Sequence, residues 1–124
     1  MGGMVEAAAA LQRGEIVTIM GDRLTGGASV EVDFLGSPTW FPLPAYALAA
    51  KTGASVAIML SSKTGRKTYT LEIEHVFKPE YDNRETRQAQ LKKAAQIFVN
   101  SLESYLKDYP YQWYNFYDFW RQND

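Results

Sequence analysis

The sequence contains no cysteine and a single histidine, His75. Without cysteine the chain can form no disulfide, thiol nucleophile or thiolate metal site. One histidine also gives little support for a metal centre, because protein metal sites normally combine several ligating side chains. We therefore expect neither a metal ion nor another cofactor.

A surplus of charge of one sign is also lacking. The 13 basic and 14 acidic residues give a formal net charge of −1, and the two signs are mixed along the chain. Domains that bind nucleic acid usually carry a clear excess of basic residues on one face. Nucleic acid is therefore not an expected partner.

The chain has no apolar run long enough to predict a membrane span. Its longest apolar stretch, residues 42–60, is interrupted by Lys51, Thr52 and Gly53. The opening residues, MGGMVEAAAALQ, lack the basic segment and apolar core of a secretory signal. We expect any membrane contact to be peripheral, and the location to be the cytoplasm or the inner face of the cytoplasmic membrane.

With 124 residues, 46% of them hydrophobic, the chain fits one domain. The patterns predict helices over residues 5–13, 45–52 and 82–107, and strands over 15–20, 29–34, 55–60 and 67–77. Residues 37–44 carry three prolines and are predicted to be irregular. This alternation predicts an α/β fold in which helices flank a layered mixed sheet.

The patterns also predict which faces are buried. Residues 15–20 and 55–60 are apolar enough for strands buried in a sheet, whereas 29–34 and 67–77 alternate as half-buried strands do. Asp82 and Glu85 have the spacing of a capping box at the start of the last helix. The apolar stripe of that helix comprises Leu91, Ala95, Phe98, Leu102, Tyr105 and Leu106.

A short motif, Gly21-Asp22-Arg23, directly follows the first predicted strand. In open α/β sheets, ligands bind at the carboxyl ends of strands. Arginine offers a planar fork for phosphate or carboxylate, and a neighbouring aspartate can hold that fork in place. The alternative is a turn in which both side chains satisfy local polar groups.

Residues 109–120, YPYQWYNFYDFW, contain eight aromatic side chains. Such a segment either packs the C-terminus onto the sheet or contacts an acyl chain or the bilayer interface, because amphipathic rings suit both environments. The candidates for a groove or interface are Trp113, Tyr114, Phe116 and Trp120.

Together with FLGSPTWFP at residues 34–42, these blocks resemble the C-terminal half of bacterial lysophospholipid-type acyltransferases, the group that includes the lipid A acyltransferases. The resemblance implies transfer of a fatty acyl group from acyl carrier protein or acyl-coenzyme A to a lipid or glycolipid hydroxyl. It further implies that Arg23 holds an anionic group and that Asp22 orients this arginine. The adjoining loop and groove would be shaped by Phe34, Gly36, Pro38, Phe41 and Pro42.

Enzymes of this group also carry a His-x4-Asp or His-x4-Glu motif upstream, whose histidine is the general base for the acceptor hydroxyl. No histidine precedes Gly21. We therefore expect this chain to be the C-terminal portion of an acyltransferase domain without the N-terminal catalytic portion, and we assign no catalytic residue. His75 and Glu80 share the motif's spacing, but they follow the other blocks, and we interpret His75 as a half-buried strand residue.

A second interpretation is a non-catalytic module that binds lipid, a membrane surface or a carrier protein. Lys63, Arg66 and Lys67 either contact an anionic headgroup or acyl carrier protein, or form a solvated hairpin tip. A sheet without its neighbouring strands leaves an apolar edge uncovered. We therefore expect self-association or vesicle binding by this chain.

Overall fold

The computed structural model describes residues 2–24, 26–114 and 119–121. These residues form helices α1 (Gly2–Gln12), α2 (Pro44–Thr52) and α3 (Arg87–Asp108), strands β1 (Ser29–Phe34), β2 (Ser37–Pro42), β3 (Val56–Lys63) and β4 (Tyr69–Phe77), and a 3₁₀ turn, η1 (Phe119–Arg121). The mixture confirms the predicted α/β class. Within the described ranges, the strands form two separate antiparallel hairpins instead of one mixed sheet.

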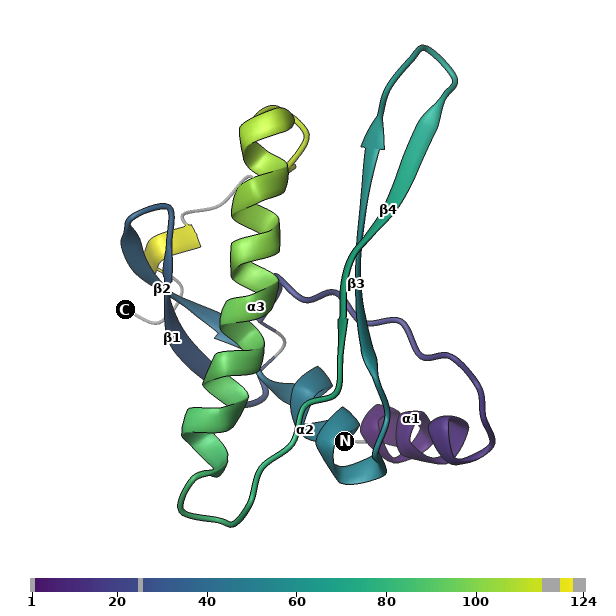
Figure 1. Ribbon diagram of the computed structural model, residues 1–124, viewed down its shortest axis with the longest axis vertical. Helices are drawn as coiled ribbons and strands as arrows, with labels where there is room; N and C mark the ends of the chain where they lie inside the picture. The colour runs from purple at the N-terminus through teal and green to yellow at the C-terminus, as the bar shows by residue number, and fades with distance from the viewer. Residues whose placement is uncertain (1, 25, 115–118, 122–124) are drawn as a thin grey trace.

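Helix α3 lies between the two hairpins, with β1–β2 on one side and β3–β4 on the other (Figure 1). The core forms where α3 packs on β1–β2 and α2, and η1 closes it. Its most deeply buried large side chains are Phe34, Phe41, Phe119, Leu43, Leu91 and Val99. Helix α1 lies beside α2 and has no buried residue, so the core does not depend on it.

The turn between β1 and β2 consists of Leu35 and Gly36, both with positive φ (52° and 81°), as two-residue hairpins require. The prediction of irregular structure for residues 37–44 is wrong over β2. The residues that flank such a turn form a hydrogen-bonded pair, and non-hydrogen-bonded pairs alternate with these along the ladder. Pro38 and Pro42 both occupy non-hydrogen-bonded positions, so the ladder does not need the N–H that proline lacks.

The predicted buried strand over residues 15–20 is wrong. This segment is not a strand, and Ile16, Ile19 and Met20 are all exposed. A strand buried on both faces needs neighbours along its edges, and no strand within the described ranges pairs with these residues. Its β-branched composition alone is therefore not sufficient to form a strand.

The β3–β4 hairpin has the predicted strands but not the predicted burial. Ile58 and Ser62 are buried, whereas the opposite face exposes Met59 and its cross-strand partner Ile73. Leu71 and Tyr69, 62% and 70% exposed, continue that apolar face towards the hairpin tip. The two-stranded hairpin has a packed face and a second face that no layer of the described chain covers.

A register shift beside Ile58 moves His75 away from that apolar face. His75 pairs with the buried Ile58, while Ile73 pairs with the exposed Met59. The alternation predicted one face for His75 and Ile73, and the bulge separates them. His75 is exposed, with its ring 5.7 Å from that of Phe77, so the prediction of a half-buried histidine is wrong.

Helix α3 is confirmed, but it begins at Arg87 and not at residue 82. The Asn83 side chain accepts the Thr86 N–H at 3.0 Å, which favours a turn before the helix. Asp82 interacts with Gln90 instead of capping the helix. The predicted apolar stripe is buried or packed against the core. No helix within the described residues is long and apolar enough to cross a membrane.

Candidate functional site

The Gly21-Asp22-Arg23 turn packs directly against α3. A Cβ atom at Gly21 would lie 2.9–3.2 Å from ring atoms of Phe98. Such distances are shorter than van der Waals contact, so a side chain here would have to displace the ring. The lack of a side chain therefore sets how closely this turn approaches the core.

Asp22 connects the turn to the C-terminal aromatic block. Its Oδ2 atom accepts a 2.9 Å hydrogen bond from Nε1 of Trp113, and the pair is partly buried. The expected contact with Arg23 is not formed: the exposed Arg23 guanidinium has no hydrogen-bond or ion-pair partner in the part of the chain that the structure describes. The turn is thus fixed through Gly21 and Asp22, while Arg23 extends outward.

Phe34 lies at the centre of an aromatic cluster that joins the block at residues 34–42 to the C-terminal aromatic block, and Asp22 connects the Gly-Asp-Arg turn to this cluster through Trp113. Its fully buried ring lies 5.3 Å from Trp113, 5.5 Å from Phe41 and 5.8 Å from Phe119. Trp120 stacks on Phe34 at 5.7 Å with an interplanar angle of 10°. Phe34 and Phe41 therefore line the core at this position, and Trp120, 38% exposed, presents the edge of the cluster to the surface.

The remaining groove candidates lie on the hairpin. Gly36 and Pro38 are exposed near its turn, and Pro42 is half-buried at the end of β2. The Leu35 N–H donates to Oε1 of Glu103 at 2.7 Å, which fixes the turn to α3. Phe116 lies outside the described residues.

The aromatic block contributes both to the core and to the surface. Trp113 packs on Phe34, whereas Tyr114 is 65% exposed. Between core and surface, the Gln112 side chain accepts the Lys63 N–H at 2.7 Å and donates to the Lys63 carbonyl at 3.0 Å. This two-sided contact fixes the tip of β3. The sequence pattern did not single out Gln112.

Tyr105 reinforces the same junction. Its hydroxyl donates to the Ser61 carbonyl at 2.9 Å. Burial raises the pKa of the Tyr105 phenol, and Tyr114 and Tyr109 add to this shift. The phenol therefore remains a neutral hydrogen-bond donor at physiological pH.

Two open surface hollows lie away from Asp22 and Arg23. One, of about 440 Å³, is formed by residues of α1 and by Arg13, which follows it. The other, of about 460 Å³, is lined by Tyr81, Arg84, Arg87 and Gln88. Sequence reasoning missed the second hollow, although two arginines three residues apart beside a helix start were visible in NRETR.

The described ranges offer few other side chains that could bind a metal ion or catalyse a reaction. They contain no group of three or more His, Cys, Asp or Glu side chains placed to hold a metal ion. His75 and Glu80 are exposed, and the buried Pro79 lies between them in the chain. No contact in the described chain joins His75 to the Asp22–Arg23 turn.

A family model described as bacterial lipid A biosynthesis acyltransferase matches residues 1–122. Comparison with curated proteins and with solved structures gave no match. The family match includes all three sequence blocks that the aromatic cluster and the Asp22–Trp113 hydrogen bond bring together.

Proposed function

Because the chain belongs to the bacterial lipid A biosynthesis acyltransferase family, we propose that it forms the C-terminal, substrate-binding portion of an enzyme that acylates a lipid or glycolipid hydroxyl. The family acts on an acyl donor and a lipid acceptor. The acyl thioester would be carried by acyl carrier protein or coenzyme A. The site would lie in the cytoplasm, at the inner face of the membrane.

The Asp22–Trp113 hydrogen bond carries this proposal. It ties the Gly-Asp-Arg turn to the C-terminal aromatic block, and Trp113 in turn contacts Phe34. Residues that are distant in sequence therefore support one turn, as a substrate site requires. Arg23 extends from that supported turn as an exposed guanidinium that has no partner among the described residues and suits an anionic substrate group.

The described residues supply binding and not general-base catalysis. A neutral hydroxyl needs a base within hydrogen-bond reach to become an effective nucleophile. The chain's one histidine, His75, is an exposed residue of β4 in contact with Phe77. We assign the base to a histidine outside these 124 residues and expect this chain alone to show no acyl transfer.

The test is substitution of Arg23 in an active enzyme that contains these residues. Arg23→Lys keeps the charge but loses the two-pronged contact, so kcat/KM should fall roughly 10-fold, and Arg23→Ala should lower it further. The matched control is Arg13→Lys, at an exposed arginine that pairs with Glu15. Unchanged kcat/KM for both Arg23 variants, with circular dichroism showing an intact fold, would reduce the motif to a structural turn.

One observation favours a second function. The exposed face of Met59, Leu71, Ile73 and Tyr69 leads to a hairpin tip with Lys63 and Lys67. An apolar face beside basic residues suits peripheral contact with an anionic membrane. On this reading the chain is a non-catalytic lipid-binding module. Acyl transfer by the purified chain, abolished by His75→Ala, would contradict both proposals.

A further inference from the structure

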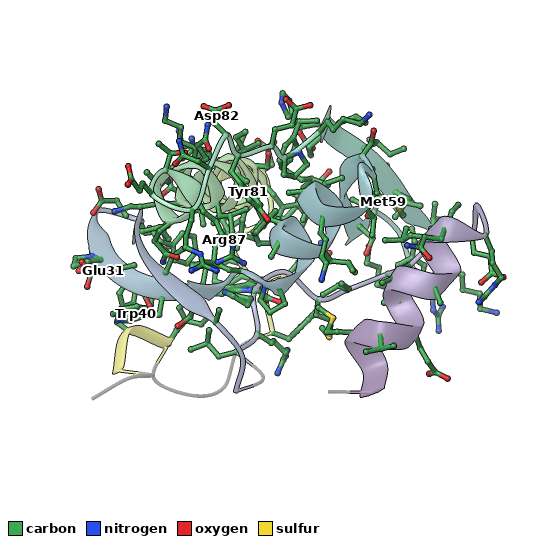
Figure 2. The ribbon with its side chains drawn as sticks, turned by 90° about the horizontal axis from the view of Figure 1, so that it is seen from below. Glu31, Trp40, Met59, Tyr81, Asp82 and Arg87 are labelled. Carbon is green, nitrogen blue, oxygen red and sulfur yellow. The ribbon has the colours of Figure 1, made fainter. Side chains whose placement is uncertain are left out.

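The hollow of about 460 Å³ lies at the N-terminal end of α3, where the loop after β4 leads into the helix. Tyr81, Asp82 and Arg87 lie around the end of α3 that faces the viewer in Figure 2. Arg84 and Gln88 complete the lining together with Tyr81 and Arg87. The hollow thus has two guanidinium groups and no carboxylate among its lining residues.

The Arg87 side chain is held in position by an aromatic ring. Its Cζ atom lies 5.6 Å from the centroid of the Tyr81 ring, within the range of a cation–π contact. A cation–π contact does not require the N–H groups to form hydrogen bonds, so these donors stay available. None of these donors makes a hydrogen bond or ion pair within the described residues, although Arg87 is only partly exposed.

Nearby carboxylates do not neutralise the two arginines. Asp82 accepts a 3.2 Å hydrogen bond from Nε2 of Gln90, and the exposed Glu85 forms no ion pair with either Arg84 or Arg87 in the described structure. The first turn of α3 contains no acidic residue. Two neighbouring cations that form no ion pair within the described residues favour an anion between them.

We propose that this hollow binds a phosphate group. Arginine forks bind phosphate oxygens through paired hydrogen bonds, and two positive charges match a phosphomonoester dianion better than a single carboxylate. The volume exceeds that of a bare phosphate, so an attached headgroup also fits. The site is separate from the Arg23 turn and does not depend on acyl transfer by this family member.

The test titrates the purified chain with inorganic phosphate and with glycerol 3-phosphate while amide chemical shifts are recorded. Saturable shifts at Arg87 and Gln88 are expected. Arg84→Gln and Arg87→Gln should each weaken binding roughly 10-fold, and Arg87→Lys should weaken it less. Lys107→Gln, which removes the same charge at the exposed far end of α3, should leave binding unchanged.

Vesicle flotation distinguishes the source of the phosphate. Vesicles of phosphatidylcholine with phosphatidic acid are compared with phosphatidylcholine alone, for the original chain and for Arg84→Gln. Binding of soluble phosphate without vesicle binding identifies a small-molecule site, whereas Arg84-dependent binding that needs phosphatidic acid identifies a lipid headgroup. Arg84 is exposed, so its substitution should leave the fold intact even if Arg87→Gln disturbs the Tyr81 contact.

Two results would overturn the proposal. One is the absence of both saturable shifts at millimolar phosphate and phosphatidic acid dependence in flotation. The other is an equal loss of binding in Lys107→Gln and Arg84→Gln, because that would mean general attraction to a positive surface.

Discussion

Asp22 and Trp113, 91 residues apart in sequence, are joined by a 2.9 Å hydrogen bond from the indole to the carboxylate. Hydrogen bonds to charged groups contribute about 1.5–3 kcal/mol. Because this pair is only partly buried, we expect a coupling free energy of about 1–2 kcal/mol. A double-mutant cycle of Asp22→Ala and Trp113→Phe, followed by urea unfolding, measures it.

The control for this cycle pairs Trp113→Phe with Asp33→Ala, which removes an exposed carboxylate on β1. These two changes should be additive within about 0.5 kcal/mol. A coupling for Asp22 and Trp113 no larger than that of the control would show that the bond does not stabilise the turn.

Gly21 should tolerate no side chain while Phe98 is present. The added methyl group would contact the ring at 2.9–3.2 Å, so Gly21→Ala should destabilise the fold by about 1–3 kcal/mol. In a Phe98→Leu background the same change should be milder, because the ring is gone. Gly3→Ala, whose methyl group meets no atom within 4 Å, is the control. Equal losses in both backgrounds would exclude the steric explanation, and thermal unfolding distinguishes the cases.

The sequence pattern predicted correctly those elements that depend mainly on residues close to one another in the sequence. Strand β1 occupies the predicted residues because its alternation matches a hairpin with one buried face. Gly53, with φ of 72°, ends α2 as predicted for a glycine after a helix. In both cases the residue type and its neighbours in sequence are sufficient.

Burial depends on layers that a local pattern does not specify. Residues 15–20 and the outer face of β4 are apolar, yet no described element covers them. Prediction of the site was limited in the same way. The motif identified Asp22 but not its hydrogen-bond partner, because Trp113 comes near it only in the folded chain. The bulge that turns His75 away from Ile73 also has no visible sequence signal.

The uncovered face of β3–β4 predicts association. We expect the chain to self-associate or to bind vesicles at micromolar concentration, because Leu71 and Ile73 are more than 60% exposed on one face. Leu71→Gln with Ile73→Gln should weaken this by about tenfold or more, since a buried aliphatic side chain contributes about 1.5–3 kcal/mol. Glu72→Gln, on the opposite face, is the control.

Sedimentation equilibrium and vesicle flotation measure this association. A monodisperse monomer that does not bind vesicles would mean that the uncovered face of β3–β4 is stable in water without a partner. Loss of association in Glu72→Gln alone would show that the contact is made by the opposite face of the hairpin and would contradict this prediction.

Tyr46 should make the fold sensitive to alkaline pH. Its side chain, which belongs to α2, is 3% exposed and stacked on Phe77 at 6.4 Å, and this burial raises the pKa of the phenol well above its ordinary value of 10. Since the folded pKa exceeds the unfolded one, the folded state holds the proton more tightly. This stabilisation is complete below pH 10 and is lost as the pH rises above it, by up to about 1.4 kcal/mol per pH unit.

Tyr46→Phe removes the ionisable group and keeps the ring, so its unfolding free energy should decline less between pH 9 and pH 11. Tyr111→Phe, at a 91% exposed position, should leave the decline unchanged. A residual slope is expected in both variants, because burial also raises the pKa of Tyr105. Urea unfolding midpoints across this pH range provide the measurement. If the original chain and Tyr46→Phe lose stability at the same rate, Tyr46 ionises without unfolding the α2–β4 contact, and its burial does not control the alkaline limit of the fold.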